Sequence, residues 1–271
     1  MYADGEEVTV NARLKAGQEL VLVFTENEEF DYAPKDLGVK IIYEDDDVAV
    51  AYKPSGVASM PVAPYYDENL LNGLAFLRSG ITFRVVTRLD KFTSGLVLLA
   101  KNALAHSVLN ENHGKTEKFY TAVAEGNVPA PLEIIAPIKS GEGKKRFARE
   151  GGKPAKTLVT AAEQCAFLNG CSLLKIKTFT GRTHQIRVHL AFVGHPLAFD
   201  DLYGNAPLNS QRKDYFTVNK ADSRQTVIGH LLSCSGIKFA HPVTGETMFF
   251  EADGEKDLSE RLSLYVPEKD R

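Results

Sequence analysis

A carboxylate at the start of a buried strand is the first feature of this sequence that could do chemistry. Residues 88–95 read Arg-Leu-Asp-Lys-Phe-Thr-Ser-Gly, and the apolar run 96–100 follows them. That run is too short and too apolar for an amphipathic helix and is typical of a buried strand, while the Thr-Ser-Gly cluster indicates a turn. We therefore expect Asp90 in a loop at the mouth of a rigid strand, where reactive side chains are often presented. Taken alone, an Arg-x-Asp segment is more often a surface ion pair beside a turn, and the other motifs of the chain change that interpretation.

A second group of polar side chains lies in residues 179–190, which read Phe-Thr-Gly-Arg-Thr-His-Gln-Ile-Arg-Val-His-Leu. Thr183 is expected to cap a helix here, and Gly194 and Pro196 are expected to end it. The apolar stripe of that helix consists of Ile186, Leu190 and Val193. Arg182 and the unpaired N–H groups of the first turn form a natural anion site, because a helix N-terminus favours negative charge. A basic, solvated helix end is the alternative interpretation.

With the stretch 43–56, these segments resemble the RluA-type pseudouridine synthases. The shared motifs run in order along the chain: Glu-Asp and Lys-Pro-x-Gly at 44–45 and 53–56, Arg-Leu-Asp-x-x-Thr-Ser-Gly at 88–95, Lys-x-Tyr at 118–120, Gly-Lys-x-Ala-x-Thr at 152–157, Gly-Arg-Thr-His-Gln-Ile-Arg-Val-His at 181–189, Gly-His-Pro at 194–196 and Asp-x-x-Tyr-Gly at 201–204. The resemblance extends from about residue 38 to the C-terminus. Thr87 and Ser233 stand where many members carry His, and neither residue would carry the chemistry.

The resemblance implies an isomerase that converts specific uridines of RNA to pseudouridine. This reaction detaches the base from the ribose, rotates it and rejoins it through carbon without gain or loss of atoms or electrons, so no cofactor or metal is expected. Asp90 would be the one carboxylate required, acting as nucleophile or base, and Arg187 would supply the cation that keeps it ionised. Tyr120 would stack on the target base and act as acid or base. Arg88 would enter the space left by the flipped uridine.

The resemblance also implies an α/β (α+β) fold, with a mixed, mostly antiparallel sheet, flanking helices and an active-site cleft that crosses the sheet. The catalytic domain is expected to span residues 36–271. Residues 1–35 would be a short acidic segment similar to the tail of a small RNA-binding domain that precedes the catalytic domain in some members. The residues of this segment predict two strands, at 8–11 and 19–24.

Apolar patterning and turn signals predict the elements that position the motifs. A strand is expected at 48–52. Asp67 is expected to cap one helix, and Asn102 is expected to cap another that runs to about Asn112,. The apolar positions of the first of these helices are Leu70, Leu74 and Leu77.

The charge of the chain is divided unevenly, which bears on RNA binding. Residues 1–47 hold 13 acidic and 4 basic side chains, a net charge of −9, and the remainder holds 22 acidic and 28 basic, a net charge of +6, so the whole chain carries −3. The densest basic patch lies between residues 139 and 156, with Lys144, Lys145 and Arg146 at its centre. We expect this patch and Arg182 to contact RNA phosphates. A solvated charge run is the alternative.

Composition and spacing argue against several other classes of protein. The chain has 271 residues, of which 44% are hydrophobic and 25% charged, as in an ordinary globular protein,. It has no apolar run of about 18 residues and no signal-peptide pattern. Its three cysteines form no Cys-x-x-Cys pair, so reduced thiols in the cytoplasm are expected,. His184 and His189 are five residues apart, which does not suit two helical metal ligands, and no Gly-x-Gly-x-x-Gly, phosphate-loop or Gly-x-Ser-x-Gly sequence occurs,.

The expected partner is a structured RNA, ribosomal or transfer RNA, bound by a monomer without contact to a membrane. Two other functions stay open at this point. A non-catalytic RNA-binding or ribosome-assembly factor on the same fold would have lost one of Asp90, Tyr120 and Arg187, and all three are present. A metal-free hydrolase of glycosidic bonds would need a second carboxylate as acid, and the sequence indicates no partner for Asp90.

Overall fold

The computed structural model describes residues 1–9, 11–21, 23, 32–112, 115–141, 143, 145–204 and 229–265. The chain divides into two compact units, Met1–Asp31 and Tyr32–Arg271. Lys144, at the centre of the basic patch, lies outside the described residues. None of the helices in the described ranges is long and apolar enough to cross a membrane.

The described residues of the first unit form three short strands, β1 (Tyr2–Ala3), β2 (Glu6–Glu7) and β3 (Leu20–Val21), paired antiparallel in the order β2-β1-β3. The strand expected at 8–11 is wrong, because its described residues lie outside any strand. The chain pairs earlier because Asp4 and Gly5, with φ of 51° and 84°, form a tight turn between β1 and β2,. β3 falls inside the range expected at 19–24. The relation of residues 1–35 to an RNA-binding domain stays a prediction.

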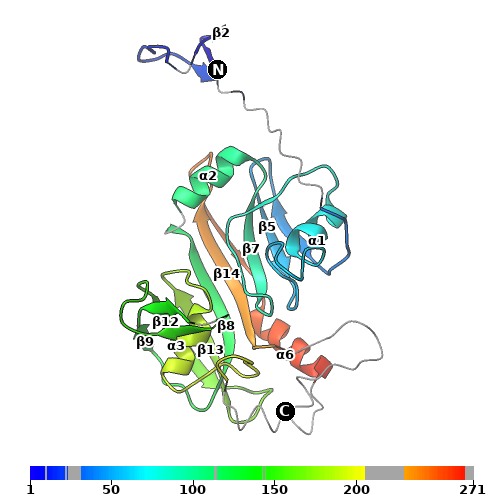
Figure 1. Ribbon diagram of the computed structural model, residues 1–271, viewed down its shortest axis with the longest axis vertical. Helices are drawn as coiled ribbons and strands as arrows, with labels where there is room; N and C mark the ends of the chain where they lie inside the picture. Colours follow the sequence, from blue (N-terminus) through cyan, green and yellow to red (C-terminus); the bar gives the residue numbers. More distant parts are fainter. Residues whose placement is uncertain are drawn as a thin grey trace. The chain divides into compact units, whose positions relative to one another are not determined.

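The second unit is built on one large sheet (Figure 1). In spatial order its strands are β4 (Lys40–Glu44), β5 (Val48–Lys53), β7 (Ser94–Ala100), β14 (Leu232–Ala240), β8 (Glu117–Glu125), β13 (Cys171–Thr178), β12 (Lys156–Gln164) and β9 (Leu132–Ile135), with β15 (Thr247–Glu251) beside β14 and β6 (Arg84–Val85) beside β7. Among the described strands of this sheet, only β7 and β14 pair in parallel. The predicted fold class, a mixed and mostly antiparallel sheet with flanking helices, is confirmed, and β5 confirms the strand expected at 48–52. A separate hairpin, β10 (Ile138–Ser140) and β11 (Arg146–Ala148), carries the basic patch.

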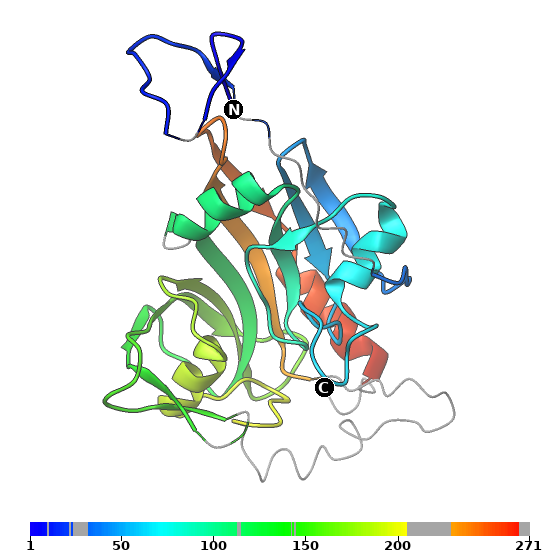
Figure 2. The same ribbon diagram turned by 45° about the horizontal axis from the view of Figure 1, so that its top comes forward.

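Helices cover both faces of this sheet, because alternate residues of each strand point to opposite sides. They are α1 (Leu70–Leu77), α2 (Ala103–Glu111), α3 (Gln185–Phe192) and α6 (Gly254–Tyr265). On β8, Tyr120 and Ala122 belong to the apolar cluster that includes side chains of α1 and α3, whereas Val123 packs with Leu258 and Leu262 of α6. The side chains of α2 join those of β5 and β7 that share the face of α6. Figure 2 shows α6 behind the strands and α1 in front of them.

The helix starts agree only in part with the predictions. α2 begins after Asn102, whose side chain accepts the Ala105 N–H, and ends before Asn112, as predicted. α1 carries the predicted leucines, but its cap is Asn69 and not Asp67, because the Asn69 side chain accepts the Leu71 N–H from an extended backbone,. α3 follows His184 and is not capped by the side chain of Thr183.

One glycine explains how the motif at 88–95 joins the sheet. Gly95 has φ of +109°, and a Cβ atom at this position would lie 2.3 Å from the carbonyl oxygen of Cys234. The parallel pairing of β7 with β14, which sets Gly95 opposite Cys234, therefore requires glycine,. β7 is buried along its whole length, as predicted, so the loop that precedes it stands on a rigid element.

Candidate active site

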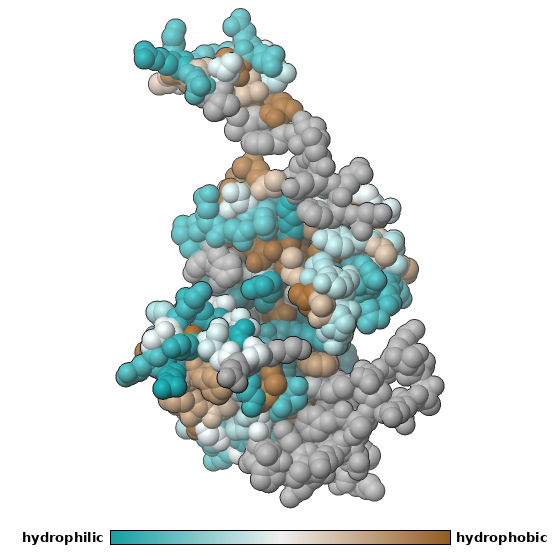
Figure 3. All heavy atoms as spheres, viewed as in Figure 1, coloured by the Kyte–Doolittle hydropathy of each residue, from teal (hydrophilic) through white to brown (hydrophobic). Residues whose placement is uncertain are grey.

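A cleft with a volume of 550 Å³ opens beside the face of the sheet that carries α1 and α3. Loops 58–65 and 88–93 and the segment 178–187 line it. In Figure 3, hydrophobic side chains show between the upper and lower halves of the larger unit, with hydrophilic side chains around them. The predicted site residues among its lining are Arg88, Asp90, Tyr120, Arg182 and Arg187. Segments from distant parts of the sequence thus meet at one cleft, whereas Lys145 and Arg146 are not part of its lining.

Asp90 lies in a turn whose backbone is held by neighbouring hydroxyl groups. The Thr93 N–H donates to the Asp90 carbonyl oxygen at 3.0 Å, and the Thr93 hydroxyl lies 2.8 Å from Nε2 of the buried His230. The Ser59 hydroxyl donates to the Leu89 carbonyl oxygen at 2.7 Å and accepts the Leu89 N–H at 3.0 Å. The Asp90 side chain itself is 26% exposed. The carboxylate therefore faces the cleft from a fixed backbone.

A buried lysine ties this turn to the Lys-Pro-Ser-Gly motif. Lys53 Nζ donates to the carbonyl oxygens of Pro54, Val57 and Lys91 at 3.1, 2.7 and 3.1 Å. Burial lowers the pKa of Lys53 to about 7. Lys53 thus joins its own loop to the turn that carries Asp90. The Lys-Pro-Ser-Gly motif, which the sequence indicated only by resemblance, therefore positions that turn.

Arg187 is the cation nearest to Asp90 among the described residues, and a third residue fixes its orientation. Asp200, which is fully buried, accepts from Arg187 Nε at 2.7 Å and from Nη2 at 2.8 Å. Arg187 Nη1 lies 3.5 Å from Asp90 Oδ2, and Nη2 lies 3.2 Å from Asp201 Oδ1. Burial on its own lowers the pKa of Arg187, but the hydrogen bonds and charge of Asp200, with Asp90 and Asp201, raise it above its ordinary value. The guanidinium is therefore a permanent, oriented cation.

Tyr120 lies beside this pair and is 7% exposed. Burial, followed by the neighbouring Cys234 and Asp90, raises its pKa well above the ordinary value. Tyr120 is therefore a neutral phenol at neutral pH, with its ring at the wall of the cleft. Arg88, by contrast, is exposed at the cleft.

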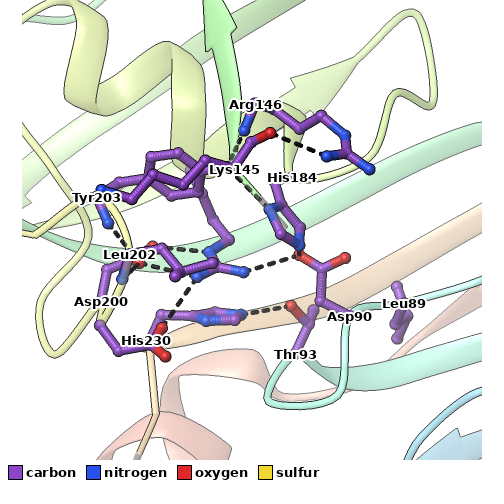
Figure 4. A network of polar contacts seen from close by, with 12 residues as sticks. Leu89, Asp90, Thr93, Lys145, Arg146, His184, Asp200, Leu202, Tyr203 and His230 are labelled. Atoms are coloured by element: carbon purple, nitrogen blue, oxygen red, sulfur yellow. Dashed lines mark hydrogen bonds and ion pairs between the residues drawn. The ribbon is translucent and has the colours of Figure 1, made fainter. Parts of the chain in front are cut away.

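The segment before α3 adds a polar chain that the sequence did not indicate (Figure 4). His184 Nδ1 lies 2.9 Å from the Tyr203 hydroxyl, and that hydroxyl accepts the backbone N–H of Arg146 at 2.8 Å. On its other side, His184 Nε2 lies 3.9 Å from Asp90 Oδ2. His184 thus lies between Asp90 and the turn at 201–204, and the Tyr203 hydroxyl of that turn is bonded to β11 of the basic hairpin.

Candidate metal ligands are engaged in other contacts. His189 bonds to the Thr157 hydroxyl and to the Ala136 carbonyl oxygen, both at 2.9 Å. Among the described residues, Asp45, Asp47 and His241 form the one group whose ligand atoms come close enough for a metal ion. Asp45 already accepts backbone N–H groups of its own turn and the Tyr43 hydroxyl, and none of the three lines the cleft.

The sequence predicted the carboxylate, the phenol and the arginine that the structure brings to the cleft, but it did not indicate the contacts that Asp200, His184 and Lys53 make around them. A signal for Asp200 was present, because a buried arginine needs a carboxylate partner and two adjacent aspartates follow the helix. Choosing between Asp200 and Asp201 required the tertiary structure, in which the first is fully buried and the second is 56% exposed.

Comparison with known proteins decides between the open interpretations. Residues 47–192 match the family described as RNA pseudouridylate synthase. The chain belongs to this family. It is 35% identical over 266 residues to an uncharacterised RNA pseudouridine synthase of Aquifex aeolicus, covering 93% of this chain and 81% of the relative. The predicted resemblance to the RluA-type enzymes is confirmed, and the protein is an isomerase, an RNA pseudouridine synthase, whose partner is RNA. The non-catalytic alternative is not favoured.

Two further relatives carry more specific names. Ribosomal large subunit pseudouridine synthase D of Neisseria meningitidis serogroup B is 36% identical over 268 residues, covering 93% of this chain and 68% of the relative. Ribosomal large subunit pseudouridine synthase C of Escherichia coli is 36% identical over 233 residues, covering 82% of this chain and 68% of the relative. Among solved structures, human RNA pseudouridylate synthase domain containing 1 has a TM-score of 0.62 at 23% identity, covering 79% of this chain and 83% of that chain, which supports the fold.

Proposed function

We propose that this chain isomerises uridine in the RNA of the large ribosomal subunit, with the Asp90 carboxylate as the reacting group. The names of the relatives that are 36% identical to the chain support the substrate class. One observation carries the assignment of the carboxylate: Asp90 is fixed by its backbone, faces the cleft, and lies 3.5 Å from a guanidinium whose other donors are held by Asp200.

The contacts of this pair support a division of labour in the reaction. Asp90 attacks the uridine or removes a sugar proton, the bond from ribose to the base nitrogen breaks, and the base rejoins through carbon. Arg187 stabilises the carboxylate and any negative charge that returns to it, because it stays charged and cannot turn away from Asp90 without breaking both bonds to Asp200. The ring of Tyr120 stacks on the base, and its hydroxyl takes part in moving the proton from the new carbon centre.

Contacts around the cleft support a path for the RNA. The target uridine must leave its helix or loop to reach a carboxylate at the wall of the cleft, which costs a few kcal/mol of stacking. Arg88 is exposed beside Asp90 and enters the space that the base leaves. Arg182 and the hairpin residues Lys145 and Arg146 bind phosphates and position the RNA without reading its sequence.

A pair of variants tests the role of Asp90. Asp90→Asn keeps the shape of the side chain but loses the nucleophile or base, so it should abolish isomerisation while RNA affinity stays within about twofold of wild type. The matched control is Asp67→Asn, an exposed carboxylate in a loop outside the cleft lining, which should keep wild-type turnover. Measurable turnover by Asp90→Asn, in a preparation free of wild-type enzyme, would overturn the assignment.

The substrate class is tested separately in cells. Pseudouridines are mapped in ribosomal and transfer RNA from cells with and without this gene, and from deletion cells that express wild type or Asp90→Asn. A site in large-subunit RNA should disappear on deletion and return only with the wild-type gene. If the lost site lies in transfer RNA, the proposed substrate is wrong while the role of Asp90 stands.

A further inference from the structure

Three polar contacts join the basic hairpin to the reacting carboxylate through residues that the proposed reaction does not use. The Arg146 backbone on β11 contacts the Tyr203 hydroxyl at 2.8 Å, Tyr203 contacts His184 Nδ1 at 2.9 Å, and His184 Nε2 faces Asp90 Oδ2 at 3.9 Å. Figure 4 shows these side chains in a row from the hairpin to the Asp90 turn. The four residues belong to four different segments, so tertiary structure alone creates the row.

The direction of each proton in this row follows from the donors. A backbone N–H can only donate, so the Tyr203 oxygen accepts from Arg146. Burial raises the pKa of Tyr203, and the phenol therefore keeps its own proton at neutral pH. Burial lowers the pKa of His184, and Arg187 and Arg146 lower it further against the opposing charges of Asp90 and Asp200, so the ring is neutral. The Tyr203 proton therefore points at His184 Nδ1, and the ring proton sits on Nε2, toward Asp90.

The last contact in the row is not yet a hydrogen bond. At 3.9 Å, the distance from His184 Nε2 to Asp90 Oδ2 is about 1 Å longer than that of a typical N–H···O hydrogen bond,. Arg187 Nη1 approaches the same oxygen and is also at the long limit, 3.5 Å. Catalytic hydrogen bonds are often long without substrate and shorten when it binds. His184 also has a left-handed backbone, with φ of 57°, which is uncommon for a residue other than glycine and occurs often at functional sites,.

We propose that Tyr203 and His184 are positioning residues that link RNA on the β10–β11 hairpin to the carboxylate of Asp90. Phosphates bound at Lys145 and Arg146 press the hairpin and Tyr203 toward the cleft, and His184 Nε2–H then donates to Asp90 Oδ2. With Arg187 and His184 both holding Oδ2, Oδ1 becomes the oxygen that reacts. This inference rests on the proposed role of Asp90 and adds a condition to it: the carboxylate takes its reacting orientation only after RNA has bound the hairpin.

The hairpin is suited to this role because its charge faces outward while one backbone group faces Tyr203. Lys139, Lys145 and Arg149 are exposed, and the Arg146 guanidinium turns back to the Lys145 carbonyl oxygen at 2.9 Å. That bond keeps the β11 backbone in the orientation in which its N–H reaches Tyr203. Binding energy from phosphates distant from the reacting base is thereby available to orient the reacting group.

The first test removes one hydroxyl group. Tyr203→Phe keeps the ring, which packs edge-on against His184 with centroids 5.7 Å apart and contacts the Arg187 guanidinium at 5.2 Å. It should lower kcat about tenfold or more, with KM and RNA affinity nearly unchanged. The matched control is Tyr66→Phe, an exposed tyrosine outside the cleft lining, which should behave as wild type. A wild-type kcat for Tyr203→Phe would overturn the proposed link. If Asp90→Asn were still inactive in that case, the proposed role of Asp90 would stand without the link.

A spectroscopic test reads the proton directly and does not depend on turnover. In protein with isotope-labelled histidine, the nitrogen shifts of His184 should show a neutral ring protonated at Nε2, and Tyr203→Phe should mix the two tautomers. Substrate RNA should move the Nε2–H signal downfield as its bond to Asp90 forms. A ring protonated at Nδ1 in the wild-type enzyme, or an Nε2–H signal that ignores RNA, would contradict the link.

Substitution of the histidine gives an independent check if Tyr203→Phe fails to fold. A glutamine amide places an N–H donor near the position of Nε2, whereas leucine fills the space without a donor. His184→Gln should therefore retain several times the kcat of His184→Leu at equal RNA affinity. Equal kcat values for the two variants would show that His184 only fills space, and the proposal would be wrong.

Discussion

Substitution of Asp200 tests whether its buried ion pair with Arg187 stabilises the protein more than an exposed ion pair does. It is fully buried and holds Arg187 with bonds of 2.7 and 2.8 Å, while the Arg187 side chain is 5% exposed. Removing one partner of a buried pair costs about 3 to 5 kcal/mol, because the remaining charge is left without compensation. Asp90 and Asp201 still contact the guanidinium, so we expect Asp200→Asn to lower the free energy of unfolding by about 3 kcal/mol, the lower end of that range.

The neighbouring carboxylate supplies the matched control. Asp201 contacts the same guanidinium at 3.2 Å but is 56% exposed. An exposed pair is worth less than about 1 kcal/mol, so Asp201→Asn should change stability little. In a chain of this size, about 1 kcal/mol corresponds to about 2 to 4 °C in Tm, which gives a decrease of about 6 to 12 °C for Asp200→Asn and less than about 4 °C for Asp201→Asn.

Both variants are measured by thermal unfolding and by equilibrium unfolding in urea, followed by circular dichroism. Equal shifts for Asp200→Asn and Asp201→Asn would refute the reasoning that burial decides the strength of the clamp. If Asp200→Asn lowered stability by less than expected but greatly lowered kcat, the main role of Asp200 would be to orient the Arg187 guanidinium.

Four further predictions follow from the same contacts. Arg187→Met should lower kcat with RNA affinity nearly unchanged, because the carboxylate of Asp90 loses the oriented guanidinium 3.5 Å away, and a wild-type kcat would contradict the pairing,. Tyr120→Phe should keep RNA binding and lose turnover in single-turnover assays, because stacking remains and the hydroxyl is gone. Changing residues 144–146 to glutamine should flatten the plot of log affinity against log salt by up to about two to three units, at about 0.7 to 0.9 per lost phosphate contact, without changing the modified uridine. Lys53 has a folded pKa of about 7, below its unfolded value, so the unfolded state binds more protons above that pH,. Stability should therefore rise between about pH 7 and pH 10 in wild type, and this rise should be reduced in Lys53→Met.

Sequence patterns predicted the elements that depend mainly on residues close together in the chain. The buried strand after the Asp90 loop follows from an uninterrupted apolar run, and the start of α2 follows from one asparagine side chain that can accept a backbone N–H. The start of α1 was placed two residues early because both Asp67 and Asn69 are good caps, and packing of the leucines chose between them,. The turn at Asp4 and Gly5 was missed because strand patterning said little over so short a segment.

The contacts that orient the site could not be predicted in this way, because each depends on which distant segments meet. Residues 88–95 and 181–189 were assigned to one site by resemblance, not by their spacing in the chain. The clamp on Arg187 depends on a turn that follows α3, and the row from Arg146 to Asp90 depends on the hairpin, that turn and the residue before α3. A hydrogen bond from a backbone N–H to a tyrosine leaves no pattern in the sequence, since any residue except proline at position 146 would offer the same donor.

Residues on the opposite face of the sheet also hold the backbone of the Asp90 turn. The contacts that remain long are therefore those of the Asp90 side chain. On α6, Arg261 donates to the carbonyl oxygens of Phe92 and His230, and Asp257 accepts the Ser94 hydroxyl. The backbone on both sides of Asp90 is therefore fixed without RNA, as expected of a preorganised site. The remaining gaps are those between the Asp90 carboxylate and its two donors, Arg187 and His184. In the proposed link, RNA on the hairpin therefore acts through Tyr203 on His184, which lines the cleft, and not on the turn itself.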